Sequence, residues 1–270
     1  MSRTGKQPAA SRIALWIVCG FIALWLIAPT LVVIPLSFTA DKSLAFPPRG
    51  VSLQWYENFF THPQWIGGLL NSIQIALLVG IIALVLGTLA AYGLSKTSGF
   101  AKAFSNGALI LPMLVPAVAF GVGVYAIFLR TGLVGTLPGF LIAHTVLALP
   151  YVVVNVGAVL STYDSQLERA AWISGAGKVK AFFTVTLPNL RTGLFSGFLF
   201  AFITSFDEVV VSMFIQSPYL QTLPVRMYSS IQREVDPTIA AAATVIMVIT
   251  TVAALLAILP GHKRKKKIDA

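Results

Sequence analysis

Residues 137–160, LPGFLIAHTVLALPYVVVNVGAVL, form an apolar stretch that contains no Lys, Arg, Asp or Glu. About 20 mostly apolar residues in a helix are enough to cross the hydrocarbon core of a bilayer. Working outward from this stretch, we find five others of similar character, at 13–38, 69–93, 108–129, 190–215 and 239–260. The pattern predicts an all-α polytopic membrane protein with six transmembrane helices in a single domain over residues 1–270.

The composition and the distribution of charge agree with this prediction. The 270 residues are 57% hydrophobic and only 10% charged, which excludes an ordinary soluble domain. The net charge of +10 suggests nucleic acid as a partner, but of the 19 Lys and Arg residues only five fall in the predicted outside loops, Lys42, Arg49, Arg130, Arg226 and Arg233. Basic residues are retained in cytoplasmic loops. We therefore expect both termini in the cytoplasm, the lipid bilayer as the surroundings, and no nucleic-acid partner.

A polar loop at 161–189 separates the fourth and fifth stretches. It contains LERAAWISGAG at 167–177 and VTLP at 185–188. This loop resembles the EAA coupling loop of ATP-binding-cassette importer permeases, whose pattern is Glu-Ala-Ala, three residues, Gly, nine residues, an aliphatic residue, one residue and Leu-Pro. Arg169 stands where that family usually has Glu, and Glu168 lies one residue early. The resemblance implies that the loop docks on a separate ATPase through Glu168, Arg169, Ala170, Ala171, Gly175, Leu187 and Pro188.

We find no sequence signature of an enzyme. The segment SGAGK at 174–178 is not a phosphate loop, because Trp172 occupies the position of its first glycine and Val179 follows the lysine. No His, Cys or acidic residues recur at the spacing of metal ligands, and Cys19 is the only cysteine. We therefore predict that this chain is not an enzyme and has no metal site and no cofactor of its own. The resemblance implies a transport subunit whose partner ATPase binds ATP and Mg.

Ionisable residues inside the spans are candidates for function, because each costs about 2.5–3.5 kcal/mol at mid-membrane by insertion scales. Asp207 and Glu208 are adjacent in the fifth stretch. If that stretch is one continuous helix, Glu208 shares a stripe with Ala201, Ser205 and Ser212, with Thr204 on its flank. We predict that Thr204, Ser205, Asp207, Glu208 and Ser212 line a path for a cation. An interhelical hydrogen-bonding seam is the alternative.

His144, in the fourth stretch, is the third ionisable residue within a span. A lone histidine on an apolar helix is either a hydrogen-bonded packing residue or part of a proton relay. Its spacing along the sequence indicates no partner.

A second resemblance lies in SFDEVVVS at 205–212 and TLPVRMYSSI at 222–231. Both segments are similar to the spermidine/putrescine class of these permeases, of the PotC-like kind. The resemblance implies a bacterial inner-membrane protein that works with a second homologous permease subunit, two ATPase subunits and an external solute-binding protein. It also implies a polyamine or a related cationic amine as the substrate.

Two other functions fit parts of the pattern. A permease of the same family could carry another small solute, such as an opine, an amino acid derivative or a phosphonate. An ion-coupled secondary transporter would also use acids inside the membrane. It would not need the coupling loop, which is why we favour the ATP-driven importer.

Overall fold

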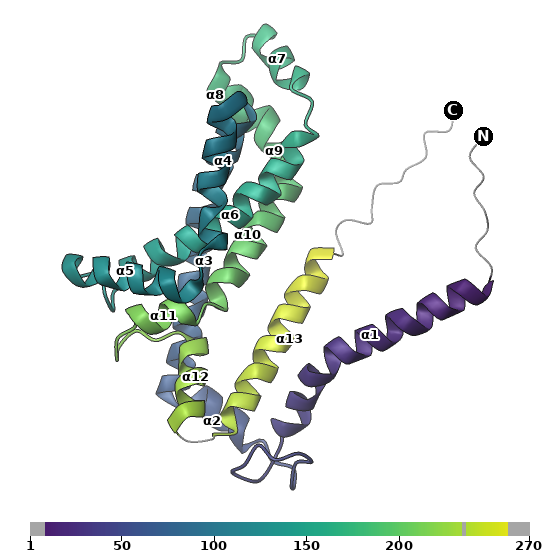
Figure 1. Ribbon diagram of the computed structural model, residues 1–270, viewed down its shortest axis with the longest axis vertical. Helices are drawn as coiled ribbons and strands as arrows, with labels where there is room; N and C mark the ends of the chain where they lie inside the picture. Colours follow the sequence, from purple (N-terminus) through teal and green to yellow (C-terminus); the bar gives the residue numbers. More distant parts are fainter. Residues whose placement is uncertain (1–8, 234–235, 259–270) are drawn as a thin grey trace. The chain divides into compact units, whose positions relative to one another are not determined.

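The computed structural model of the protein describes residues 9–233 and 236–258. Apart from one isolated bridge between Ser217 and Leu220, the regular elements of these described residues are helices (Figure 1). The chain divides into two compact units, one drawn from residues 1–63 and 229–270 and the other from residues 64–228. The all-helical prediction is therefore confirmed.

Among its described residues, the first unit contains the helices α1 (Ala9–Leu36), α2 (Gln54–Thr61) and α13 (Thr238–Ile258). Asn58 Nδ2 of α2 donates a hydrogen bond of 2.8 Å to Thr238 Oγ1 at the start of α13. Trp55 Nε1 donates one of 2.7 Å to the carbonyl of Thr39, in the segment that follows α1. These bonds make α2 the element that joins the other two helices of the unit.

The second unit holds the candidate site. Its first helix is α3 (Pro63–Ser95), which begins at the boundary between the two units. Its last helix is α12 (Leu223–Arg233), whose final residues belong to the first unit. Between them, in chain order, lie α4 (Gly99–Leu114), α5 (Ala117–Thr131), α6 (Leu137–Ser161), α7 (Gln166–Ile173), α8 (Lys178–Ala181), a π-helical turn (Phe182–Thr186), α9 (Leu187–Asn189), α10 (Arg191–Phe206) and α11 (Val210–Ile215).

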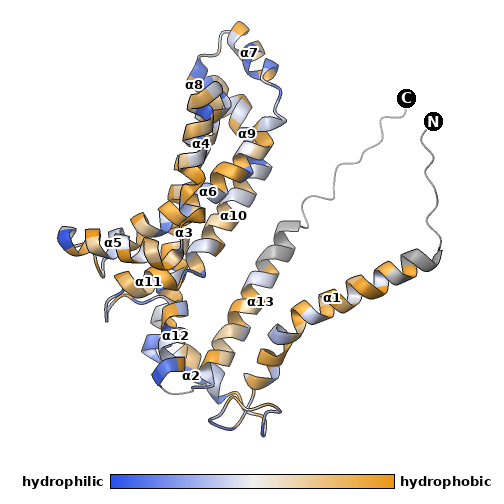
Figure 2. Ribbon diagram, viewed as in Figure 1, coloured by the Kyte–Doolittle hydropathy of each residue, from blue (hydrophilic) through white to orange (hydrophobic). Residues whose placement is uncertain are grey.

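The core of this unit forms where α6 packs between α3 and α10. Hydrophobic residues dominate these helices in Figure 2, whereas α7 and α8 are more hydrophilic. A Cβ on Gly87 of α3 would lie 2.7 Å from the side chain of Val152, and one on Gly197 of α10 would lie 3.3 Å from its Cα. Small residues therefore let two helices approach the same residue of α6, as expected where lipid supplies no hydrophobic drive between helices.

The third predicted stretch, 108–129, is not one straight helix. It is divided between α4 and α5, which meet at an angle of 98°. The break falls at Val115, which is in extended conformation, and at Pro116. Because proline cannot donate a backbone hydrogen bond and restricts the residue before it, the helix ends there.

The fifth predicted stretch, 190–215, is also interrupted. α10 ends at Phe206 and α11 begins at Val210, so Asp207, Glu208 and Val209 lie in the break. The assumption of one continuous helical stripe through Glu208 is therefore wrong. Glu208 Oε1 accepts the N–H of Val211 at 2.7 Å and so supplies an acceptor at the start of a new helix.

Three helices of the described residues are long and apolar enough to cross a membrane, in the ranges Leu15–Leu36, Pro63–Ser95 and Leu137–Ser161. Counting the bent pair of α4 and α5 as one span makes four. Two shorter apolar helices, Arg191–Phe206 and Thr238–Val252, lie in the fifth and sixth predicted stretches. The polytopic membrane class is confirmed, and the count of six spans stays a prediction.

We expect Gly193→Ala to destabilise the second unit. A Cβ at this position of α10 would lie 3.0 Å from the carbonyl oxygen of Asn155 and 3.2 Å from Cα of Val156, both backbone atoms of α6. Gly157→Ala on α6 is the matched control, because no atom lies within 4 Å of its Cβ position. In an exposed helix, Gly→Ala by itself stabilises by about 1 kcal/mol.

The yield and melting temperature of the purified protein measure the effect. Gly193→Ala should lower both, and Gly157→Ala should leave them unchanged or raise them. Equal behaviour of the two variants would show that the contact between α6 and α10 is not tightly packed.

Candidate functional site

The loop at 161–189 contains the short helix α7, and Gly175 follows the end of that helix. The N–H of Gly175 donates to the carbonyl of Trp172, and the N–H of Ala176 donates to that of Ala171, both at 3.0 Å. This pair of bonds is the Schellman arrangement, which needs a left-handed residue after the helix. Gly175 has φ +85°, and no atom lies within 4 Å of where its Cβ would be. Within this chain the glycine is therefore required for backbone conformation and not for close packing.

Glu168 anchors α7 to the end of α3. Its side chain is only 1% exposed, although it lies on a surface loop. Lys96 Nζ approaches Glu168 Oε2 at 2.7 Å, and the hydroxyl of Tyr92 donates to Oε1. The Tyr92 ring packs edge-on against Phe182 of the π-helical turn, with centroids 4.9 Å apart. The end of α3 is thus joined to the loop on both sides of Gly175.

The electrostatics of this anchor favour the ionised carboxylate. Burial raises the pKa of Glu168, but hydrogen bonds from Lys96 and Tyr92, together with the charge of Lys96, outweigh it, and the pKa lies below its usual value. Arg169, at the position of the usual motif acid, is exposed. The acid displaced by one residue therefore faces the permease itself, and the arginine faces outward.

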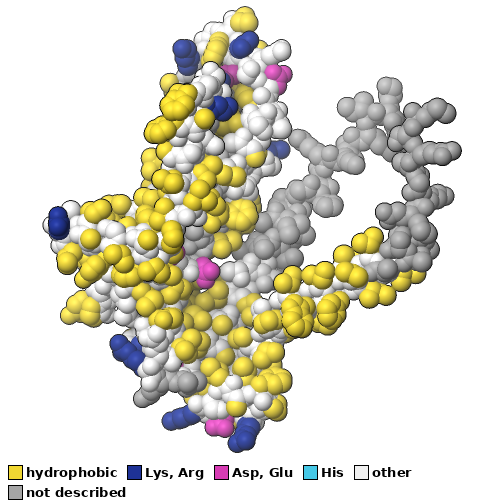
Figure 3. Space-filling model, viewed as in Figure 1, with side chains coloured by type: hydrophobic (Ala, Val, Ile, Leu, Met, Phe, Trp, Pro, Cys, Tyr) yellow, Lys and Arg dark blue, Asp and Glu magenta, His cyan; other side chains and the backbone are white. Residues whose placement is uncertain are grey.

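The outer face of the loop is apolar and basic. Ile173 is 89% exposed and Val179 70%. Figure 3 shows Lys and Arg side chains gathered at the end of the unit that carries α7 and α8. Ala170 and Pro188 are exposed, while Ala171 and Leu187 are half-buried. A cavity of about 440 Å³ lies between the loop and α3, with Tyr92, Lys96 and Trp172 among its lining residues. Such a face can receive another protein.

The break between α10 and α11 separates the predicted path residues into two groups. Asp207 is exposed, and Thr204 and Glu208 are half-buried. Ser205 and Ser212 are buried, so they do not line the same surface. No side-chain hydrogen bond or ion pair engages the Asp207 carboxylate within residues 9–233 and 236–258. The acid pair thus has one carboxylate that caps a helix and one that is open to a ligand.

His144 supplies the partner that the buried serines need. Its Nδ1 lies 2.9 Å from Ser205 Oγ, and its Nε2 lies 3.0 Å from Ser212 Oγ. Sequence spacing did not indicate this cluster, because the histidine is 61 and 68 residues away from the two serines. The packing interpretation of His144 is therefore the one that the geometry supports.

A second anchor that sequence reasoning missed joins α3 to the loop before α12. Asn71 Nδ2 donates to the carbonyl of Gln221 at 3.0 Å, and Ser72 Oγ accepts the N–H of Leu223 at 2.8 Å. Gly68 lies beside the same segment, and a Cβ there would make an ordinary van der Waals contact, 3.4 Å from Cα of Leu223. Two adjacent polar residues near the start of the apolar stretch 69–93 were the available signal.

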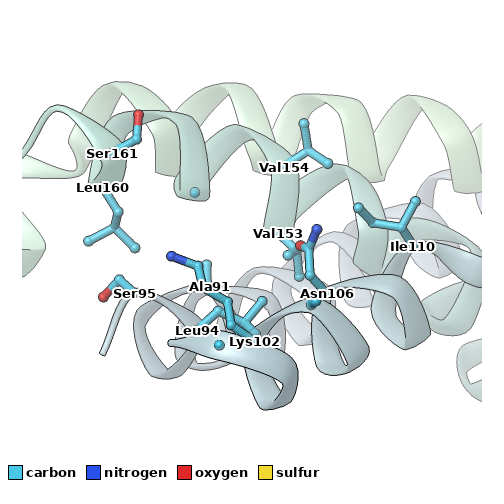
Figure 4. Close-up of a pocket in the computed structure, with 13 residues that line it drawn as sticks. Ala91, Leu94, Ser95, Lys102, Asn106, Ile110, Val153, Val154, Leu160 and Ser161 are labelled. Atoms are coloured by element: carbon cyan, nitrogen blue, oxygen red, sulfur yellow. The ribbon is translucent and has the colours of Figure 1, made fainter. Parts of the chain in front are cut away.

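A larger cavity of about 780 Å³ lies between α3, α4 and α6 (Figure 4). Lys102 and Asn106 of α4 are the charged and amide side chains in its lining, which otherwise comes from small, hydroxyl and apolar residues. A lysine without an acid in the lining repels an amine cation. This cavity is therefore not a selective site for cations, and none of the predicted path residues line it.

We expect Lys96→Ala to loosen α7. Removing the lysine leaves the buried Glu168 carboxylate with Tyr92 as its remaining partner, at a cost of about 1–3 kcal/mol. Amide hydrogen exchange of Gln166–Ile173 in the purified protein should accelerate by a factor of about 5 to 150. Lys180→Ala, an exposed lysine in α8, is the control and should leave the exchange unchanged.

The same anchor should depend on pH. A carboxylate with a lowered pKa stabilises the folded state at neutral pH and loses that contribution as the pH falls through the folded-state pKa. Exchange in α7, normalised to the intrinsic rate, should therefore accelerate in acid for the original protein and change less for Glu168→Gln. Identical acid responses would contradict this assignment.

Comparison with solved structures identifies the fold. The chain aligns over 97% of its length, and over all of the other chain, with a bacterial ABC transporter for import of the acidic polysaccharide alginate, at a TM-score of 0.70 and 15% identity. An amino acid ABC transporter with histidines matches 78% of this chain and 98% of that one, at a TM-score of 0.58 and 18% identity. These likenesses show that the helices follow the arrangement of an importer permease.

Sequence relatives agree. The chain is 30% identical to the spermidine/putrescine permease PotC of Haemophilus influenzae, over 82% of this chain and 86% of that protein. It is 32% identical to the putrescine permease PotI of Escherichia coli K12, over 82% and 81%. Residues 83–264 match the family described as binding-protein-dependent transport system inner membrane component. This chain belongs to that family, and it is a multi-pass inner-membrane permease of an ATP-binding-cassette importer, a transport subunit and not an enzyme.

Proposed function

We propose that this permease admits polyamines such as spermidine or putrescine, or a related small cationic amine. The observation that carries the proposal is the exposed carboxylate of Asp207 at a helix break inside an otherwise apolar span. Relatives at 30% and 32% identity that are named for spermidine and putrescine transport support it.

The two acids of the break have different roles in this proposal. Glu208 accepts the N–H of Val211, so its charge is already used to begin α11. Asp207 is exposed, so its carboxylate can meet an ammonium group that sheds water. Opposite charges attract far more strongly in a low-dielectric region than in water. A cation gains from this compensation, whereas an anion is repelled. The hydroxyl oxygen of Thr204, beside the break, can accept a hydrogen bond from the ammonium group.

The family implies a binding protein and an ATPase as partners. We further propose a second homologous permease subunit that closes the path, and two ATPase subunits that bind ATP and Mg, so that this chain needs no cofactor. The exposed face around Arg169, Ala170 and Ile173 docks on the ATPase. Glu168 then acts indirectly, by transmitting movement of the loop to α3. Each partner must prefer one of two transporter states for transport to be coupled.

The proposed topology is six spans with both termini in the cytoplasm, in a single transmembrane domain with the coupling loop at 161–189. This follows from the distribution of basic residues. In a Cys19→Ser background, a cysteine in place of Tyr219 should react with an impermeant thiol reagent added to intact cells. Tyr219 is 95% exposed in the loop before α12. A cysteine in place of Ser98, also exposed, should react only after lysis. The reverse pattern would overturn the orientation.

Neutralising the acids tests the substrate class. Asp207→Asn should reduce putrescine uptake about tenfold or more, because about 1.4 kcal/mol of lost stabilisation corresponds to a factor of ten. Glu208→Gln should have a smaller effect, because its amide oxygen can still accept the Val211 N–H. Asp41→Asn, which changes an exposed acid outside the predicted spans, is the control and should transport normally.

Uptake is measured per assembled transporter, with saturating loaded binding protein, and assembly is followed by co-purification with the ATPase. Normal uptake by Asp207→Asn would contradict a cation path at the break. If the cognate binding protein is thermally stabilised by opines, phosphonates or amino acid derivatives and by no amine, the permease carries another solute.

A further inference from the structure

The buried cluster of His144, Ser205 and Ser212 joins two helices across a break. Ser205 belongs to α10 and Ser212 to α11, and the imidazole of α6 lies between their hydroxyls. His144 and Ser212 are 0% exposed, and Ser205 is 3% exposed. The aromatic ring of Phe140 packs on the imidazole, with centroids 5.5 Å apart. The imidazole therefore has two polar contacts and one aromatic contact, which together define its orientation.

A break in a span needs such a contact, because the helical hydrogen bonds stop there. The N–H of Asp207 still bonds to the carbonyl of Ile203, and that of Met213 bonds to Val209, so each helix is complete only up to the break. α11 has few hydrogen bonds of its own. Its far end is held by the N–H of Gly135, which donates to Ile215 O at 2.7 Å. His144 holds its near end, and fixes it relative to α10.

Hydrogen-bond chemistry makes this contact specific to histidine. In a neutral imidazole one ring nitrogen donates and the other accepts, and each serine hydroxyl can do either. Both contacts can therefore form at once with either tautomer. A purely apolar residue of similar size would fill the space and leave two buried hydroxyls without this partner.

We propose that His144 is a positioning residue for transport, which sets the angle between α10 and α11 and thereby presents Asp207 to the substrate. The inference rests on the proposed function, because it requires that Asp207 meet the substrate. It adds that His144, which is buried and does not touch the substrate, controls how well Asp207 binds the substrate. In this proposal the buried cluster of His144, Ser205 and Ser212 determines the position of Asp207.

The test separates the polar contact from packing. His144→Phe combined with Ser205→Ala and Ser212→Ala removes the histidine and both hydroxyls, so that no buried polar group is left without a partner. This apolar triple variant should assemble with its ATPase at a normal level. Its putrescine uptake per assembled transporter, at saturating loaded binding protein, should fall about tenfold.

A double-mutant cycle then asks whether His144 acts through the acid. Asp207→Asn is combined with the triple variant, and we expect the combined loss to be no larger than that of Asp207→Asn alone. Losses that multiply to about a hundredfold would show that the two sites act independently and would overturn the inference. Uptake at the original level in the triple variant would also overturn it, since packing alone would then suffice.

Two further variants keep the outcome interpretable. His144→Gln retains one donor and one acceptor and should restore most of the uptake. Ser196 lies in α10, as Ser205 does, and its hydroxyl donates to carbonyls of α10 itself. Ser196→Ala should therefore transport normally. If the triple variant fails to assemble, the cycle is run with Ser212→Ala, which removes one contact and keeps that to Ser205.

The failure of this inference is distinguishable from that of the proposed function. Asp207→Asn with normal uptake removes the proposed function, and with it the premise of the inference. Reduced uptake in Asp207→Asn, with independent losses in the cycle, removes the inference alone.

Discussion

Backbone hydrogen bonding inside a membrane is the constraint on which the rest of this structure depends. Each unpaired backbone group in hydrocarbon costs several kcal/mol, so a span can be interrupted only where protein groups or a water-filled path satisfy it. The break at Asp207, Glu208 and Val209 is such an interruption. Glu208 satisfies the N–H of Val211, and α5 and α6 cover the short helix that follows. The acid pair therefore has a structural partner in Glu208 and an exposed member in Asp207.

Polar residues near the two ends of α3 bind groups of two loops in a similar way. Near its start, Asn71 and Ser72 bind the backbone of the segment before α12. Near its end, Tyr92 and Lys96 bind the Glu168 carboxylate. A single helix thus holds the loop at 161–189 near one end and the loop before α12 near the other.

Arg169 stands at the position where the EAA pattern has Glu, and the packing of its neighbour Glu168 shows what becomes of the acid. The family's usual acid is absent at this position, and the acid one residue earlier points back to α3, where it is buried to 1% exposure. An unpaired buried carboxylate would be strongly unfavourable, and the neighbouring lysine and tyrosine remove that penalty. The arginine is left on the outer face, among other basic residues and exposed apolar ones. The chain therefore presents an exposed cation where the EAA pattern has an acid.

The sequence by itself determined the class of the protein, the positions of its apolar stretches and the position of the polar loop at 161–189. These follow from local properties, namely the apolar length needed to cross a bilayer and the glycine needed for φ +85° at position 175. Only the tertiary structure decided the break at 207–209, the partners of His144 and the burial of Glu168. The serines lie 61 and 68 residues from the histidine, and Lys96 and Tyr92 lie 72 and 76 residues from Glu168. Helical periodicity relates residues within one helix, and contacts between helices depend on how closely those helices pack.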